Sequence, residues 1–188
     1  AVDIVEGRLF VVTDLHGEWA AYVRYRDAFL GLYSHGQADR FILLGDVVHH
    51  HGEPDEDYSL HILWDIMRLQ SELGTERVIL LLGNHELPHI YTVPISRGDE
   101  PFTSRFEHTL GEYRESIVAF LKSLPFMIRT AGGVMFVHAG ADKLSSVPEH
   151  VELLHRFSHD GLLAEAERLL ASSDVQDLIA RVLQLSAE

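Results

Sequence analysis

Four short apolar segments of this chain each run directly into side chains that can bind metal, and this feature constrains the fold most. The segments cover residues 8–13, 41–44, 78–82 and 134–137, and their apolar, β-branched character is typical of buried strands. The polar residues that follow them are Asp14 and His16, then Asp46, then Asn84 and His85, then His138. In open α/β sheets, binding sites form just beyond the carboxyl ends of the strands. We therefore expect the four polar clusters to converge on one edge of a sheet.

The segments between these strands have helical patterns, which predicts an α/β layered domain. Apolar residues at helical spacing predict helices over 18–32, 58–73 and 105–123. Residues 88–104 contain three Pro and predict an irregular surface loop. Residues 126–129 and 134–137 predict two paired strands around a Gly-rich turn. Because no linker interrupts the pattern, we expect a single domain over residues 1–188, with its core motifs within 8–141 and a C-terminal helical segment over 147–188.

The composition limits the kinds of functional site that the chain can carry. The chain has no Cys, which excludes disulfides, thiolate metal sites and a Cys nucleophile, and which fits a reducing, cytoplasmic location. It has 13 His and a formal net charge of −14, which favours a metal site with nitrogen and oxygen ligands and disfavours nonspecific nucleic-acid binding. Its apolar runs are too short for a transmembrane helix. We expect no specific nucleic-acid or membrane partner.

The strand-end residues have complementary ligand chemistry. Asp14 and His16 lie two positions apart, so in an extended segment their side chains share a face and can reach one cation. The Asp46 carboxylate has two oxygens and can bridge two cations, while Asn84 offers an amide oxygen and His138 a nitrogen. Each residue alone is more often a turn former, a helix cap or a core residue. Together they indicate a two-metal site, which can activate water and bind a phosphoryl group.

This series resembles the calcineurin-like metallophosphoesterase superfamily. Its order and spacing are most similar to the phosphoprotein phosphatase (PPP) branch of serine/threonine protein phosphatases, especially the bacterial Shewanella-like phosphatases. The motifs that carry the resemblance are Asp14-Leu15-His16-Gly17, Gly45-Asp46-Val47-Val48, Gly83-Asn84-His85-Glu86 and Val137-His138-Ala139-Gly140.

The resemblance implies a four-layer αββα sandwich that carries two divalent ions, either Mn, Fe or Zn. It implies that Asp14 and His16 bind the first ion, that Asp46 bridges, and that Asn84 and His138 bind the second. It also implies that His85 is the general acid for the leaving alcohol, which makes His85 and Asp46 the expected catalytic residues.

The chain departs from the PPP pattern after Asp46. His49 stands where that branch has the Asp partner of the catalytic His, and His50 stands where it has a phosphate-binding Arg. An imidazolium at His50 or His51 can contact phosphate but has no bidentate fork. The alternative for this segment is a solvated loop or adventitious metal binding. We take His49, His50 and Asn84 as the candidate phosphate-binding residues.

A second departure lies towards the C-terminus. The superfamily pattern supplies a further His ligand in a Gly-His segment after His138, and this chain contains no Gly-His dipeptide. His155 and His159 lie four residues apart and on one helix would share a face, but we favour partly exposed helix-surface positions for both. We therefore expect the sandwich to be incomplete at the C-terminus, by truncation or missing segments.

These features predict hydrolysis of phosphate esters by water activated between two metal ions. The expected activity is that of a phosphomonoesterase of the serine/threonine protein phosphatase type, acting on a phosphorylated protein or a small phosphate ester. A phosphodiesterase or dinucleoside-polyphosphate hydrolase is the alternative, since the Arg position is vacant. A noncatalytic metal-binding interaction module is a third possibility.

Overall fold

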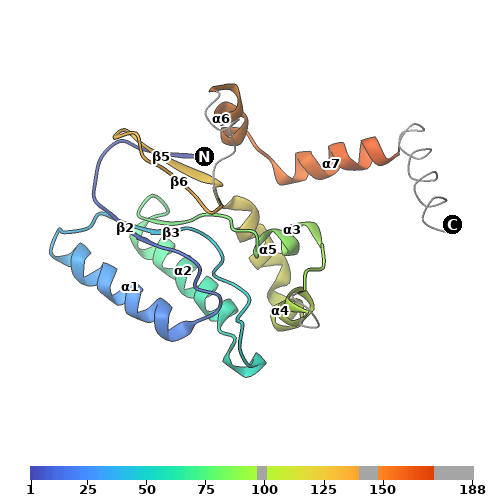
Figure 1. The fold of residues 1–188 in the computed structure, drawn as a ribbon, viewed down its shortest axis with the longest axis horizontal. Coiled ribbons are helices and arrows are strands. Elements are labelled where there is room, and N and C mark those ends of the chain that lie inside the picture. The colour runs from blue at the N-terminus through green and yellow to red at the C-terminus, as the bar shows by residue number, and fades with distance from the viewer. Residues whose placement is uncertain (97–100, 140–147, 172–188) are drawn as a thin grey trace.

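Three parallel strands form the sheet that carries most of the predicted polar clusters. In the computed structural model (Figure 1), β2 (Leu9–Val12), β3 (Arg40–Leu43) and β4 (Val78–Leu80) lie in the order β2-β3-β4. Their register pairs Val12 with Leu43 and Leu43 with Leu80, so the three strands end level with one another. The carboxyl ends of three adjacent strands therefore lie at one edge, as the sequence predicts.

A second sheet combines one strand from the start of the chain with two strands that come more than 120 residues later. It contains β1 (Val2–Ile4), β5 (Met127–Thr130) and β6 (Met135–Val137) in the order β1-β5-β6. β1 and β5 are parallel, whereas β5 and β6 form the expected antiparallel pair. The structure describes residues 1–96, 101–139 and 148–171.

Helices surround the two sheets. The described helices are α1 (Trp19–Ser34), α2 (Ser59–Leu73), α3 (Leu87–Tyr91), α4 (Phe102–Leu110), α5 (Arg114–Ser123), α6 (Pro148–His155) and α7 (His159–Leu170), with short 3₁₀ turns at Pro54–Glu56 and Gly111–Tyr113. Gly74 follows α2 as the expected C-cap, with φ of 106°. Each helix in the described part of the chain is too short or too polar to cross a membrane.

The layering follows from the alternation of side chains along β3. Phe41 and Leu43 face one way, into the core that α1 and α2 cover, and the Phe41 ring stacks on Phe29 with centroids 5.1 Å apart. Ile42 faces the other way, into a second cluster with Ile128 of the opposite sheet. The described layers therefore run from helices to the first sheet and then to the second. The α/β layered prediction is confirmed.

Two predictions about the connecting segments were wrong in part. Part of the predicted loop over 88–104 is helical: α3 takes up Pro88 in its first turn, where the missing N–H is not needed, and α4 begins at Phe102. The predicted helix over 105–123 is broken at Gly111, whose φ of 46° is unfavourable for other residues. These breaks fold α3, α4 and α5 into a group beside the carboxyl end of the first sheet (Figure 1).

The prediction for His155 and His159 was also wrong in part, because the two residues belong to different helices. His155 ends α6 and lies 3.6 Å from Asp3, which places α6 beside the second sheet. His159 begins α7 and is buried, with its Nδ1 2.7 Å from the hydroxyl of Tyr91. The two imidazoles therefore do not form one metal-binding face.

Candidate metal centre

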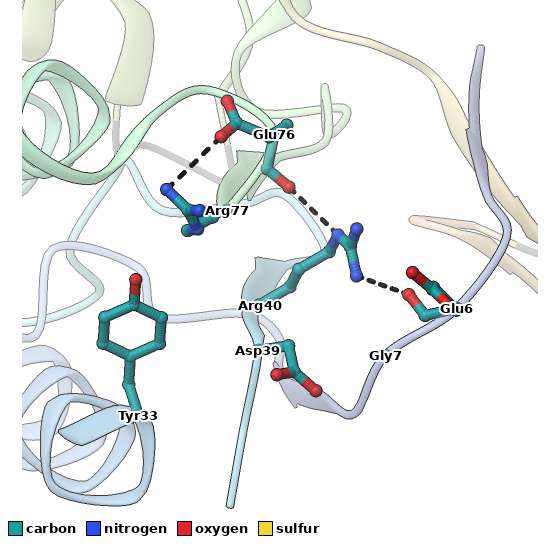
Figure 2. A pocket seen from close by; sticks show the side chains of 7 residues that line it. All are labelled: Glu6, Gly7, Tyr33, Asp39, Arg40, Glu76 and Arg77. Atoms are coloured by element: carbon teal, nitrogen blue, oxygen red, sulfur yellow. Dashed lines mark hydrogen bonds and ion pairs between the residues drawn. The ribbon is translucent and has the colours of Figure 1, made fainter. Parts of the chain in front are cut away.

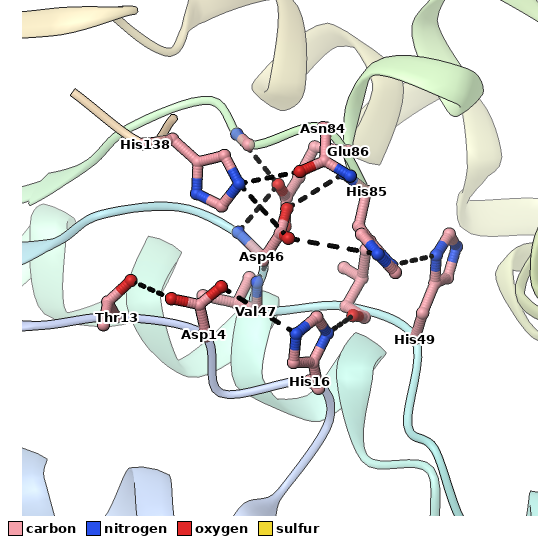
Figure 3. Close-up of polar contacts among 12 residues, drawn as sticks. Thr13, Asp14, His16, Asp46, Val47, His49, Asn84, His85, Glu86 and His138 are labelled. Carbon is pink, nitrogen blue, oxygen red and sulfur yellow. Dashed lines mark hydrogen bonds and ion pairs between the residues drawn. The ribbon is translucent and has the colours of Figure 1, made fainter. Parts of the chain in front are cut away.

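The polar residues of the four strand ends meet in one place, as Figure 3 shows. Asp14, Asp46 and Asn84 come from the carboxyl ends of β2, β3 and β4, and His138 follows β6 of the other sheet. The single-edge prediction is therefore corrected in one respect: the cluster lies between the ends of two sheets. His138 crosses to the first sheet by a hydrogen bond of 2.8 Å from its Nδ1 to the carbonyl oxygen of Leu44.

The backbone at this cluster is strained. Five described non-glycine residues have positive φ, and four of them are site candidates: Asp14, His16, Asp46 and His49, with φ of 49°, 43°, 51° and 68°. Such left-handed conformations cost free energy for residues with a Cβ and persist only where the surroundings enforce them. Strain of this kind concentrates at functional sites, which supports a functional role for this edge.

Asp46 lies at the centre of the cluster and is 4% exposed. Its Oδ2 lies 3.2 Å from Nε2 of His138 and 3.9 Å from Nε2 of His85. Among the described residues, two groups have ligand atoms that all lie within 4.8 Å of one another: Asp14, Asp46 and His138, and His16, Asp46 and His85. Asp46 belongs to both groups, as a bridging carboxylate requires. Oδ1 of Asp14 also lies 3.9 Å from Nε2 of His16, a distance compatible with the expected pairing of these two residues.

The hydrogen bonding of His138 fits a cation. A carbonyl oxygen can only accept, so His138 donates from Nδ1 to Leu44, which leaves Nε2 as the nitrogen available to a cation. That nitrogen lies 2.8 Å from Oδ1 of Asn84 and 3.2 Å from Oδ2 of Asp46. An imidazole nitrogen, an amide oxygen and a carboxylate oxygen so close together form a donor set that suits a divalent transition-metal ion. The donor set therefore fits the metal ions that the motifs imply.

Glu86 ties the two central loops together. Its fully buried carboxylate accepts hydrogen bonds from the backbone N–H groups of Asp46 at 3.0 Å, Val47 at 2.8 Å and Gly83 at 2.9 Å. Burial raises the pKa of Glu86 to about 7, and the nearby Asp46 carboxylate adds to this shift while the three N–H donors oppose it. Glu86 thus fixes the backbone on which Asp46 is mounted.

Two glycines allow these loops to approach closely. Gly45 has φ of +94°, and a Cβ on it would lie 2.8 Å from the Cα of Gly83. A Cβ on Gly83 would in turn overlap the Asp46 carboxylate. Only glycine fits at both positions, which explains the Gly-Asp and Gly-Asn pairs in structural terms.

His85 projects from the β4 loop towards Asp46, and His49 lies behind it. The Nδ1 atoms of His85 and His49 are 2.9 Å apart, and the His49 ring is 1% exposed. Burial lowers the pKa of His85, and the Asp46 carboxylate opposes that shift. The position of His49 favours a role exerted through His85 over direct phosphate contact.

His50 is held on the other side of the same loop. Its Nδ1 lies 3.2 Å from the Glu18 carboxylate, and its Nε2 lies 3.8 Å from that of Glu56. These contacts attach the loop to the start of α1. Direct phosphate contact by His50 remains a prediction that this geometry does not favour.

Sequence reasoning missed two residues next to this site. His89 lies 2.8 Å from His49 through their Nε2 atoms, and Glu107 lies 2.7 Å from Nδ1 of His89. The one sign of His89 in the sequence is its spacing of four residues from His85, which places two residues on one face of a helix. The prediction of a loop over 88–104 hid this sign. Glu107 has no motif spacing that could have identified it.

A separate pocket lies at the opposite, amino ends of the strands (Figure 2). Its lining residues are Glu6, Gly7, Tyr33, Asp39, Arg40, Glu76 and Arg77. The Arg40 guanidinium bonds the carbonyl oxygens of Glu6 at 2.6 Å and Glu76 at 3.2 Å, so this cation already has partners. The strand-end cluster is therefore the better candidate for chemistry.

The fold and the ligand cluster together define a metal-dependent phosphoesterase architecture. The family model described as calcineurin-like phosphoesterase matches residues 7–181, and the chain belongs to this family. No curated protein sequence is significantly similar to the chain.

The solved structures that are similar to the chain include the following three. A Saccharomyces cerevisiae serine/threonine phosphatase with similarity to human phosphatase PP5 has 17% identity and a TM-score of 0.51, over 78% of this chain and 44% of that one. A candidate diadenosine tetraphosphatase has 23% identity and a TM-score of 0.46, over 74% of this chain and 54% of that one. A metallophosphoesterase from Sphaerobacter thermophilus has 15% identity and a TM-score of 0.30, over 64% of this chain and 42% of that one.

The family match and the likeness to the yeast phosphatase confirm the predicted metallophosphoesterase fold. At these identities the likeness to solved structures concerns the fold alone. The chain spans about half the length of the first two of these proteins, 54% and 44%.

Proposed function

We propose that this protein hydrolyses phosphate esters with the help of two divalent metal ions, as a phosphomonoesterase of the serine/threonine protein phosphatase type. The observation that carries the proposal is the place of Asp46 in both groups of potential ligands, from which we assign His85 to proton donation and the other residues to metal binding. When bound, two divalent ions supply an activated water and neutralise charge on the phosphoryl group. The lack of Cys leads us to place this activity in the cytoplasm.

The residues of this chain have distinct roles in the proposal. Asp14, His16, Asp46, Asn84 and His138 hold the ions. His85 donates a proton from Nε2 to the oxygen of the leaving alcohol as its bond to phosphorus breaks, because an alkoxide is a poor leaving group and His is suited to proton donation near neutral pH. Asn84, next to His85, also offers its amide to a phosphoryl oxygen.

The experiment is hydrolysis of p-nitrophenyl phosphate by protein loaded with Mn²⁺, Zn²⁺, Ni²⁺ or Mg²⁺, with the bound metal quantified in the same samples. We expect turnover that rises with metal content and stops on chelation. Metal uptake without turnover under all four conditions would instead support the noncatalytic metal-binding module.

A phosphodiesterase or dinucleoside-polyphosphate hydrolase is the second candidate, and the position of His50 favours it. A monoester dianion needs more positive charge around its terminal oxygens than a diester does. The contacts of the His50 ring with Glu18 and Glu56 make it less suited to replace the Arg of the PPP pattern. Faster turnover of bis(p-nitrophenyl) phosphate than of the monoester would favour this candidate.

A further inference from the structure

A continuous row of hydrogen bonds runs from His85 away from the metal centre. His85 Nδ1 lies 2.9 Å from His49 Nδ1, and His49 Nε2 lies 2.8 Å from His89 Nε2. His89 Nδ1 lies 2.7 Å from Oε1 of Glu107, whose Oε2 accepts from Arg114 Nε at 2.6 Å. The row connects the loops after β3 and β4 with α3, α4 and α5.

Aromatic rings shield the middle of this row from water. His49 and His89 are 1% and 0% exposed. The Phe102 ring stacks on His49 at 5.7 Å with an interplanar angle of 11°, and the Phe106 ring packs edge-on against both His49 and His89. Each nitrogen of the two buried imidazoles therefore has one partner, and that partner belongs to the row.

The direction of the hydrogen bonds follows from the carboxylate at the far end. Although burial disfavours its charge, hydrogen bonds from His89 and Arg114 lower the pKa of Glu107. An ionised carboxylate only accepts, so His89 must donate from Nδ1. Burial lowers the pKa of His89 and keeps its ring neutral, which leaves its Nε2 as an acceptor.

The same logic fixes the next two rings. His49 is also a neutral, buried ring, so it donates from Nε2 to His89 and accepts at Nδ1. The partner of that acceptor is His85, which must donate from its own Nδ1. Its Nε2 then remains the nitrogen that faces Asp46, at 3.9 Å.

We propose that Glu107 is a positioning residue which, through His89 and His49, fixes the ring orientation and tautomer of His85. This inference rests on the proposed function, in which His85 is the general acid. When His85 passes a proton from Nε2 to the leaving oxygen, its Nδ1 hydrogen stays on its own ring and keeps its hydrogen bond to His49. No proton therefore has to travel along the row.

A substitution at position 49 separates this role from a general effect on folding. In aspartate and histidine, Oδ and Nδ1 are each attached directly to Cγ, so His49→Asp places a carboxylate oxygen close to the present acceptor. That oxygen accepts from His85 directly and makes the rest of the row unnecessary. Glu107 should therefore be needed in the native protein and dispensable in the His49→Asp background.

The test is a pair of kinetic comparisons in which Glu107→Gln is made in each background. In the native background we expect kcat to fall roughly 10–100-fold, the range typical of residues that orient a metal-binding imidazole, with KM little changed. The fall should be larger for phenyl phosphate than for p-nitrophenyl phosphate, whose leaving group hardly needs a proton. In the His49→Asp background the same substitution should have little further effect. Glu115→Gln, at an exposed carboxylate of α5, is the matched control.

A readout independent of turnover is the tautomer of His85, measured at pH 8 by ¹⁵N NMR of histidine-labelled, zinc-loaded protein and assigned by comparison with His85→Asn. We expect hydrogen on Nδ1 in the native protein and a mixture of tautomers in Glu107→Gln. A native His85 with hydrogen on Nε2, or an unchanged spectrum in Glu107→Gln, would overturn the inference. If the native protein hydrolyses no phosphate ester, the proposed function fails, while the tautomer still decides whether the row acts as described.

Discussion

Replacing Gly45 with Ala tests whether the close approach of two glycines positions Asp46. The φ of Gly45 is +94°, and an added Cβ would lie 2.8 Å from the Cα and the N of Gly83 and 3.0 Å from Nδ1 of His138. A left-handed conformation costs a residue with a Cβ roughly 1–2 kcal/mol. Overpacking against the backbone adds roughly 1–3 kcal/mol. We therefore expect Gly45→Ala to lower the free energy of unfolding by about 2–5 kcal/mol.

Two other glycines separate these contributions in equilibrium urea unfolding. Gly133 has φ of +81° with no atom within 4 Å of an added Cβ, so Gly133→Ala should cost only the conformational part, about 1–2 kcal/mol. Gly31 lies within α1 in equally open space, so Gly31→Ala should stabilise the protein by about 0.5–1 kcal/mol. A cost for Gly45→Ala no greater than that for Gly133→Ala, with normal metal content, would refute the reasoning.

Two further predictions concern His85, the proposed general acid, and an ion-pair cluster that joins α1 to α2. We expect His85→Asn to keep the native metal content but to slow hydrolysis about 10²–10⁴-fold, with a smaller loss for substrates that have good leaving groups. An equal loss on all substrates would indicate a binding role for His85. The control is His61→Asn, at an exposed position of α2. Burial opposes ionisation of Asp65, but hydrogen bonds from Arg26, Arg68 and Tyr22 outweigh it and lower its pKa from the usual 3.8. The contribution of Asp65 to stability is then complete above pH 3.8 and is lost as the pH falls through the lower folded-state pKa. In urea unfolding Asp65→Asn should cost about 1–3 kcal/mol at pH 7, and a difference from the native protein that persists at the lowest pH would contradict this assignment.

The sequence predicted the central sheet and the positions of the candidate ligands at its edge because both depend on local patterns. A buried parallel strand is a short apolar run, and the residue after it must lie at the carboxyl edge whatever the rest of the chain does. Asp14, Asp46 and Asn84 were therefore located from the strands alone. His138 was located in the same way from the strand over 134–137, but its place in a second sheet was not predicted, because β1 is a three-residue strand with only Ile4 buried and so has no clear apolar pattern.

The arrangement behind His85 could not be predicted in this way. It depends on a turn of helix that includes Pro88, on a helix break at Gly111, and on the packing of three short helices. Glu107 reaches His89 across 18 residues of sequence, and no periodicity fixes such a contact. Tertiary packing, rather than local propensity, decides which carboxylate lies behind His85.

The number of metal ions bound by Asp46→Asn tests the central claim most directly. Native protein, Asp46→Asn and the distant control Asp65→Asn would be saturated with Zn²⁺, desalted and analysed for zinc per chain, with p-nitrophenyl phosphate turnover measured on the same samples. Because Asp46 belongs to both ligand groups, we expect Asp46→Asn to lose metal from both positions and nearly all turnover while remaining folded. Native metal content or near-native turnover in Asp46→Asn would contradict a dinuclear centre built around this carboxylate.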